Sequence, residues 1–347
     1  MKSVVYIIKF TVIAVVVAVT VCCSTEDKYL RTLPLEVEVL NASDSINIDR
    51  FELFQSNEVV RIDDNWLLIA ATKGDYRLLF VNVATSEHFF AIRKGRGPGE
   101  MLDGGSLHKC GNDALLYCMK TATCIRIFLE ESVDERKAVY DTVGVFKSSV
   151  SKPAYMTSVG KNGFVSGNMA DPNVWYSLYD REGNILSSVE ALSFEELSQD
   201  YDDLVSFHMS CKYASNPAGT KVCVASVASP SLSFADIDSG ILKEYKRSAL
   251  PPIGMIESRL RPDHTSAFVG VAADDEYVYV IYSGHKLFDD VLPTDECRHL
   301  IIYDWKGTPV RHYLLNHSIS SIHVDGKAIY GTSTYPESCV YKFCLPN

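Results

Sequence analysis

The chain has 347 residues, of which 47% are hydrophobic and 22% are charged, a composition typical of a folded globular protein and not of a disordered one. Lys and Arg total 33 against 44 Asp and Glu, so the formal net charge is -11. This charge argues against a nucleic-acid-binding surface and against attachment to anionic lipid by electrostatics.

Residues 1–23 predict an export signal. Lys2 and Lys9 give the segment a basic start, and the apolar run "FTVIAVVVAVTV" follows. This run is too short for a membrane-spanning helix, which needs about 20 apolar residues, and it suits the core of a signal peptide. The chain is therefore expected to be exported.

The apolar run ends at a pair of cysteines, Cys22 and Cys23, and a polar segment follows. This arrangement is similar to a bacterial lipoprotein signal, in which the cysteine is acylated and becomes the mature N-terminus. We expect Cys23 to carry the lipid, because Cys22 before it is the smaller neighbour, with Cys22 as the alternative. An ordinary cleaved signal or an uncleaved anchor is the competing interpretation. Residues 24–32 are then a polar tether, and residues 33–347 are the folded domain.

Eight cysteines lie beyond the signal, and an exported domain permits disulfides. Cys118 and Cys124 flank one predicted turn symmetrically, and Cys211 and Cys223 flank another. Each pair could form a bridge across its hairpin, or all four could be buried free thiols, since bridges across a hairpin are often strained.

A unit of about 50 residues recurs six times along the chain. Each unit has a turn signal followed by a short run rich in Val, Ile and Tyr, then a polar loop and a second such run, and this enrichment favours strands. The turn signals lie at Asp63-Asp64, Gly111-Asn112, Asn162-Gly163, Asn216 to Gly219, Asp274-Asp275 and Asp325-Gly326. Three units add an Asp-to-Gly turn between later strands, in "DREG", "DIDSG" and "DWKG".

Six units of four antiparallel strands predict an all-β fold, a six-bladed β-propeller. The sixth unit ends one strand short, after "CVYKFCL", while the early segment "PLEVEVL" at residues 34–40 alternates and has no partner of its own. We therefore expect an N-terminal strand, at residues 34–40, to complete the last blade and close the ring.

The segments "YVYVIYSG", "HLIIYDWKGTPVRHYLL", "SSIHVDGKAIYG" and "GRGPGE" resemble the TolB-like six-bladed propeller lipoproteins of the bacterial envelope. The resemblance extends over the whole mature chain. It implies the propeller fold and an envelope location, which with the lipoprotein signal means the outer membrane of a Gram-negative bacterium. The family has no established catalytic residues, so the resemblance assigns none to this chain.

The glycine-rich stretch "IRKGRGPGEM" raises the possibility of a phosphate cradle. Such a cradle needs a helix that begins directly after the glycines, and Glu100 to Asp103 followed by two more glycines predict none. The stretch is therefore predicted to be a corner between the first two blades, with a basic spot of Arg93, Lys94 and Arg96 suited to a carboxylate or an acidic partner.

Four innermost strands each carry a polar candidate for the central channel: Arg61, His108, His208 and His323. They could converge on an anion or a metal, or be ordinary hydrogen-bonded channel residues. Their spacing is not that of a metal site, and the carboxylates cluster in turns, so we expect no metal ligand set, no cofactor and no catalytic residue.

These observations predict a non-catalytic binding or scaffolding module that acts through the face bearing the glycine loop and the loop at 284–298. The partner would be an envelope protein or a glycan. One alternative is a metal-dependent hydrolase or lyase at the channel mouth. Another is a glycan-binding component of a surface uptake system, for which Tyr76, Trp175 and Tyr335 are the candidate stacking residues, although packing against the rim is the more ordinary role for them.

Overall fold

The structure is a computed structural model that describes residues 28–51, 56–71, 74–103, 105–145, 155–159, 163–167, 174–190, 210–227, 229–248, 266–284, 297–334 and 337–346. The chain divides into two compact units, Met1–Leu35 and Glu36–Asn347. In the first unit a short helix, α2 (Lys28–Thr32), falls within the segment predicted as a tether. None of the described helices has the length and apolar character needed to cross a bilayer.

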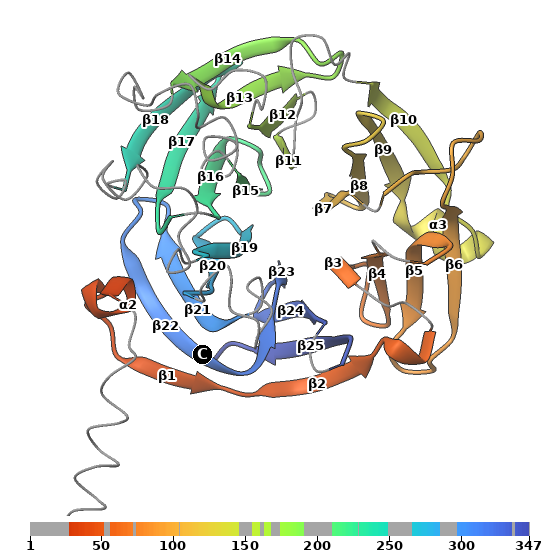
Figure 1. Cartoon of the computed structure of the whole chain (residues 1–347), viewed down its shortest axis with the longest axis horizontal. Helices are drawn as coiled ribbons and strands as arrows, with labels where there is room; N and C mark the ends of the chain where they lie inside the picture. The colour runs from red at the N-terminus through yellow and green to blue at the C-terminus, as the bar shows by residue number, and fades with distance from the viewer. Residues whose placement is uncertain are drawn as a thin grey trace, which may run out of the picture. The chain divides into compact units, whose positions relative to one another are not determined.

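The second unit consists of six sheets, one for each repeat (Figure 1). The first three are β3 (Ser56–Arg61), β4 (Trp66–Ala71), β5 (Tyr76–Asn82) and β6 (His88–Arg93); β7 (Ser106–Cys110), β8 (Asp113–Cys118), β9 (Thr123–Phe128) and β10 (Tyr140–Val145); and β11 (Met156–Val159), β12 (Gly163–Ser166), β13 (Val174–Asp180) and β14 (Ile185–Glu190). The next three are β15 (Cys211–Ser215), β16 (Lys221–Ser226), β17 (Leu232–Asp238) and β18 (Ile241–Arg247); β19 (Phe268–Ala273), β20 (Tyr277–Tyr282), β21 (Cys297–Asp304) and β22 (Pro309–Ile319); and β23 (Ser321–Asp325), β24 (Ala328–Ser333) and β25 (Cys339–Cys344).

The innermost strands form a closed ring, because each one contacts the innermost strand of the next blade. The contacts run from β3 to β7, β11, β15, β19 and β23, and from β23 back to β3. Strands within a blade pair antiparallel and in sequence order, so the predicted six-bladed propeller is confirmed.

The N-terminal segment closes this ring with two strands (Figure 1). β2 (Ala42–Asn47) pairs antiparallel with β25 and is the fourth strand of the last blade. β1 (Val37–Leu40) instead pairs parallel with β22 and adds a fifth strand to the neighbouring blade. Closure by an N-terminal strand is thus as predicted, but the segment at 34–40 does not provide the closing strand; the residues directly after it do.

Several strands are apolar at consecutive positions and do not alternate between apolar and polar residues, because each sheet is covered on both faces. β4 shows this clearly, since all six of its residues are buried. Trp66, Leu68 and Ala70 pack with the second blade, whereas the intervening Leu67 and Ile69 pack with Tyr330 and Val340 of the sixth blade. A strand with a side-chain period of two therefore contributes to two cores at once.

Asp and Gly form the turns as the sequence predicted. Asp180 Oδ1 accepts a hydrogen bond of 2.7 Å from the Asn184 amide, and Gly183 takes a φ of 83°. The turn at Asp304 to Gly307 repeats this geometry, with a hydrogen bond of 2.8 Å from the Thr308 amide to Asp304. The turns between the first and second strands use the same device, since Asp274 accepts the Tyr277 amide at 2.7 Å.

In the described part of the second unit, two short helical segments lie outside the blades' strands. The 3-10 turn η1 (Asp49–Phe51) follows the closing strand, and α3 (Leu129–Glu135) separates the two outer strands of the second blade. The buried Ser132 of α3 donates to the Phe128 carbonyl at 2.6 Å and accepts the Val139 amide at 2.9 Å, which fixes the helix against the strand ends.

Candidate functional site: the central channel

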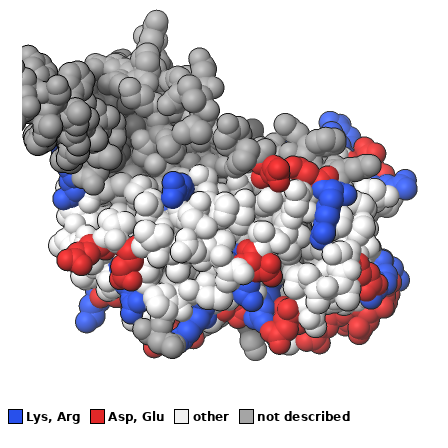
Figure 2. All heavy atoms as spheres, turned by 90° about the horizontal axis from the view of Figure 1, so that it is seen from below, with Lys and Arg blue, Asp and Glu red and all other residues white. Residues whose placement is uncertain are grey.

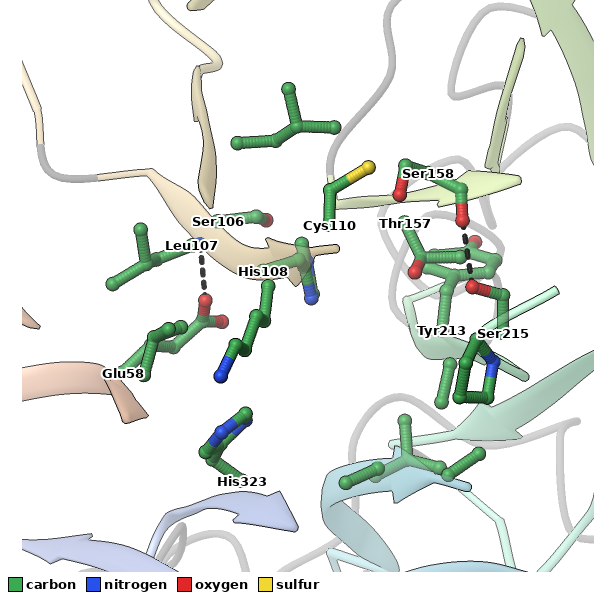
Figure 3. Close-up of a pocket in the computed structure, with 18 of the residues that line it drawn as sticks. Glu58, Ser106, Leu107, His108, Cys110, Thr157, Ser158, Tyr213, Ser215 and His323 are labelled. Carbon is green, nitrogen blue, oxygen red and sulfur yellow. Dashed lines mark hydrogen bonds between the residues drawn. The ribbon is translucent and has the colours of Figure 1, made fainter. Parts of the chain in front are cut away.

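A cavity of about 910 Å³ occupies the centre of the propeller. All six innermost strands contribute to its lining, as do turns between the first and second strands, such as Gly111 and Gly326. Figure 3 shows Glu58, His108 and His323 around this space, from strands β3, β7 and β23. The channel is therefore the place where side chains from different blades meet.

Two of the four predicted channel residues, His108 and His323, line this cavity. Arg61 lies at the end of β3 beside the turn, where its guanidinium donates to Asp325 at 2.6 Å and also pairs with Asp64. His208 lies outside the described residues. Arg61 is thus a paired residue at the rim, and the two histidines are the predicted residues that the fold brings to the channel.

The Nε2 atoms of His108 and His323 are buried and have no hydrogen-bond partner among the described residues. Burial, assisted by the positive charge of Lys212 and opposed by the backbone of Met156, lowers the pKa of His108 to about 4. Burial likewise lowers the pKa of His323 to about 3, assisted by the charge of Lys109 and opposed by Asp325. Both imidazoles are therefore neutral at neutral pH.

Glu58 is a channel residue that the sequence analysis missed. Its carboxylate accepts a hydrogen bond from the Leu107 amide of the adjacent blade. Burial raises the pKa of Glu58 to about 7, although Lys212 and the Leu107 amide both oppose this rise. An acid with this pKa changes its charge near neutrality.

Lys212 of β15 is the second channel residue that the analysis missed. Its Nζ lies 4.0 Å from the centre of the Tyr155 ring, a cation–π distance. Within the described parts of the chain no carboxylate lies within ion-pair distance of it. Its charge still acts on Glu58 and on His108, as their pKa shifts show.

Two other cations of the channel lining, Lys109 and Arg126, have carboxylate partners, unlike Lys212. Lys109 lies 3.8 Å from Asp325, which also binds Arg61, and Arg126 pairs with Asp141 at 2.9 Å. Charge at the rim is thus largely compensated by carboxylates. No group of three His, Cys, Asp or Glu side chains that could hold a metal ion occurs among the described residues.

The glycine stretch forms a corner and not a phosphate cradle. The backbone crosses between Arg93 and Met101, whose amide donates to the Arg93 carbonyl at 2.9 Å, and the Gly97 amide donates to Glu100 at 2.8 Å. A Cβ at residue 95 would lie 1.9 Å from the Glu100 carboxylate, so a larger residue there would displace the Glu100 side chain from the loop. In the part of the chain that is described, the next helix after the stretch begins at Leu129.

Arg93, Lys94 and Arg96 are all exposed on this corner. Arg93 lies over the Tyr76 ring at 5.8 Å, and none of the three pairs with a carboxylate within ion-pair distance among the residues described. Beside them a second pocket of about 450 Å³ is lined by Arg96, Lys120 and Tyr140. Two basic residues, Arg96 and Lys120, therefore border a depression between the first two blades, together with Glu100.

Trp175 and Tyr76, two of the three candidate stacking aromatics, are packed against other side chains. Trp175 is buried in β13 beneath Arg247, whose guanidinium carbon lies 4.6 Å from the ring centre. Tyr76 begins β5 and stacks on Phe90 with ring centres 5.3 Å apart. Tyr335 lies outside the described residues. The loop at 284–298 is likewise outside them, apart from its ends.

The cysteines of the described chain are free thiols, including both pairs considered for bridges. Cys118 lies opposite Thr123 in the sheet, and Cys124 lies opposite Tyr117, so the two thiols are offset by one position. Burial raises the pKa of Cys124 and of Cys211 to about 12, which keeps both thiols protonated and unreactive.

Taken together, the closed ring of six sheets around one channel, each with four antiparallel strands and one with an added fifth strand, defines a six-bladed β-propeller. The family model described as "TolB-like 6-blade propeller-like" matches residues 60–327, which is most of the ring. The chain therefore belongs to the TolB-like propeller family. No curated protein matches its sequence.

Solved structures share the fold at low sequence identity. A putative exported protein from Bacteroides fragilis NCTC 9343 is 12% identical, with a TM-score of 0.52 over 90% of this chain and 100% of its own. The calcium-binding protein regucalcin from Agrobacterium tumefaciens str. C58 is 10% identical, with a TM-score of 0.54 over 89% and 95% of the two chains. A gluconolactonase from Xanthomonas campestris is 11% identical, with a TM-score of 0.51 over 90% and 97%. At these identities the likeness concerns the fold alone.

Proposed function

We propose that this protein is a lipid-anchored binding module of the cell envelope that docks an acidic partner protein on its glycine-loop face. That face is defined here by Arg93, Lys94 and Arg96 together with Lys120 of the adjacent turn. The protein does no chemistry in this role. It holds its partner near the membrane.

The observation that carries the proposal is the exposure of the loop cations on a rigid corner. The loop is held by its own hydrogen bonds, from the Gly97 amide to Glu100 and from the Met101 amide to Arg93. Its cations consequently project from a fixed backbone, and binding costs little backbone ordering. Arginine favours carboxylates because its planar fork forms two parallel hydrogen bonds.

The N-terminal sequence supports the envelope location. Residues 1–23 have the basic start and apolar core of an export signal, and Cys23 or Cys22 follows at the position of a lipidated cysteine. With two or more acyl chains a protein stays on the membrane without any charge attraction to lipid. The net charge of -11 makes this acyl anchor the natural mode of attachment.

The two alternatives have less support. A glycan reader needs exposed aromatic rings around a groove, yet Trp175 is buried and Tyr76 is stacked between Phe90 and Arg93. No specific observation on the described residues supports a metal-dependent hydrolase.

The test is chemical crosslinking in intact cells that express the full-length protein. The native chain is compared with a variant in which Arg93, Lys94 and Arg96 are all changed to Ala. The proposal predicts that a defined envelope protein is recovered with the native chain and lost with the variant.

A matched control removes three exposed lysines from the opposite ends of the blades: Lys243, Lys306 and Lys327, all changed to Ala. This control lowers the net charge by the same amount and leaves the glycine-loop face intact. It should retain the partner. Loss of the partner in both variants, or in neither, contradicts docking through the loop cations.

A further inference from the structure

The central channel contains polar groups that the glycine-loop face does not use. We propose that this cavity binds a small organic carboxylate, with the Lys212 ammonium as its counter-ion and the His108 and His323 imidazoles as its hydrogen-bond partners. The site is distinct from the docking face and is assembled from different blades.

Lys212 differs from Lys109, another lysine of the cavity, in the group that lies beside its ammonium. Inside a protein a lysine normally has a carboxylate close by, because an unpaired buried charge is costly. Lys109, in the same cavity, has Asp325 at 3.8 Å. Lys212 has instead an aromatic face, the Tyr155 ring at 4.0 Å, and among the described residues no carboxylate at ion-pair distance. Its ammonium is thus available to a bound anion.

The two channel histidines each have a buried ring nitrogen with no partner among the described residues. Most buried polar atoms have a hydrogen-bond partner, so each exception needs an explanation. The buried Nε2 atoms of His108 and His323 have none among the described residues, and both rings belong to the cavity lining. Two unpartnered imidazole nitrogens on different blades are explained by a ligand placed between them.

The charge of the site favours a carboxylate over a phosphate. At neutral pH the two imidazoles are neutral, since burial lowers the pKa of each below its usual range. Lys212 then supplies one positive charge, and Glu58 offsets part of it as it ionises. A single cation balances a singly charged carboxylate, whereas inorganic phosphate carries more than one negative charge near pH 7.

The cavity also has a suitable size. Its volume of about 910 Å³ lies within the range of small-molecule sites, which is roughly 300–1,000 Å³. The lining combines apolar residues such as Val269 and Ile322 with many charged, hydroxyl and imidazole side chains, so a ligand with both an apolar part and an ionised group finds a match for each.

The experiment is isothermal titration of the purified full-length protein in detergent with acetate, butyrate, gluconate and benzoate, and separately with inorganic phosphate. At least one carboxylate should bind one to one with a Kd of about 1 mM or tighter. The change Lys212→Gln should weaken this binding roughly 10- to 100-fold, the effect of losing a charged hydrogen bond. Lys212→Arg should retain most of it.

Two controls make the result specific. Lys243→Gln removes an exposed lysine outside the cavity and should bind as the native protein does. The Arg93, Lys94 and Arg96 triple variant should also bind carboxylate normally, so a failure of the docking face and a failure of this site can be told apart. Circular dichroism of Lys212→Gln and Lys212→Arg checks that both are folded.

The outcomes decide the matter as follows. Carboxylate binding that is lost in Lys212→Gln and kept in Lys212→Arg supports the site. Absence of binding by all four carboxylates, equal binding by the native protein and Lys212→Gln, or a preference for phosphate each overturns it.

Discussion

Glu58 is a channel residue whose charge changes near neutral pH. Its carboxyl lies against the Leu107 amide of the next blade, and the charge of Lys212 acts both on it and on His108. Because burial raises its pKa from 4.5 to about 7, the folded protein keeps a proton that the unfolded chain loses over this interval. The stabilising effect of that proton is fully present below pH 4.5 and is lost as pH rises to 7.

This titration gives a prediction for Glu58→Gln. Between pH 4.5 and 7, ionisation of Glu58 should lower the free energy of unfolding of the native protein by about 3 kcal/mol. The reason is that one pKa unit corresponds to about 1.4 kcal/mol. The glutamine side chain can still accept the Leu107 amide but does not ionise. The variant should therefore lack this decline and gain stability relative to the native protein at the alkaline end.

Urea unfolding at both ends of the interval measures the effect. His108 and His323 titrate with the opposite sign, since their lowered pKa values destabilise the fold as pH falls. They are present in both proteins, so the difference between the two curves isolates Glu58. Parallel pH profiles for the two proteins would show that Glu58 ionises normally.

The histidines and the missed residues show what a sequence can reveal about this channel. His108 and His323 were predicted because each precedes a turn signal in an apolar strand. Glu58 and Lys212 are also ionisable residues inside predicted innermost strands. Their role in the channel depends on the residues that lie opposite them, and those residues belong to other blades. Which side chains face one another depends on the register and tilt of all six blades, and these are not encoded in any one strand.

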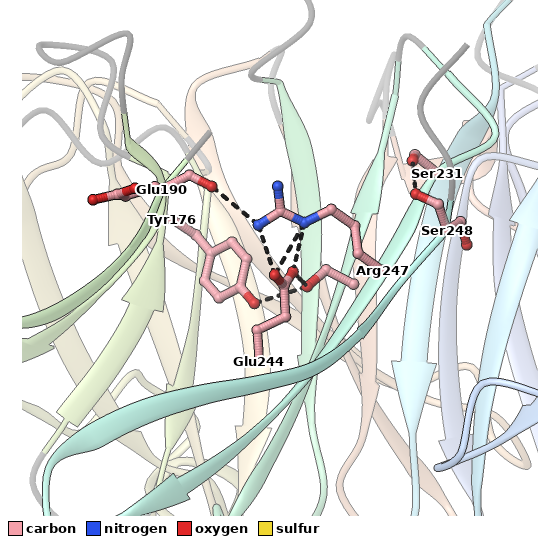
Figure 4. A network of polar contacts seen from close by, with 7 residues as sticks. Tyr176, Glu190, Ser231, Glu244, Arg247 and Ser248 are labelled. Carbon is pink, nitrogen blue, oxygen red and sulfur yellow. Dashed lines mark hydrogen bonds and ion pairs between the residues drawn. The ribbon is translucent and has the colours of Figure 1, made fainter. Parts of the chain in front are cut away.

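At the scale of the element, two adjacent blades are joined by a polar network between β13, β14, β17 and β18 (Figure 4). Arg247 donates to Glu244 at 2.6 Å and to the Glu190 carbonyl at 3.0 Å. The Glu244 carboxylate also accepts the Ser233 hydroxyl, which lies 2.8 Å from the Tyr176 hydroxyl. The ion pair is well covered, with side-chain exposures of 17% and 20%.

We predict that Arg247→Ala destabilises the protein by about 2 to 3 kcal/mol, because it leaves Glu244 as an unpaired, largely buried charge. Urea unfolding at neutral pH gives the difference. Lys243→Ala is the matched control on the same strand, since Lys243 and its partner Asp238 are both well exposed and such pairs contribute little. Equal effects for the two variants would mean that the network does not hold the blades together.

The strands themselves were largely predictable. Val, Ile and Tyr enrichment between Asp and Gly turns located the blades, because these residues suit a sheet and these turns suit a hairpin. The closing strand was predicted a few residues too early, since "PLEVEVL" alternates more clearly than "ASDSIN" does. Alternation marks a strand but does not say which edge it joins, and the parallel pairing of β1 with β22 arises from the tertiary fold.

At the scale of the whole molecule, the surface combines an acidic average with local basic spots. On the side shown in Figure 2, Lys and Arg lie among Asp and Glu without a field of single sign. The glycine-loop face differs in that three cations follow within four residues, and Lys120 lies across the adjacent pocket. Such a spot can select an acidic partner even though the net charge is -11.

Docking through this face is tested most directly by photo-crosslinking in living cells from a position that leaves its cations unchanged. Met119 meets this requirement: it is 49% exposed and adjoins Lys120, while Ile241, 50% exposed, lies at the opposite ends of the blades as a matched control. With a photoreactive residue at each position in turn, we expect a defined protein adduct from position 119 and none of that mass from position 241. The same adducts from both positions, or none from position 119, would contradict it.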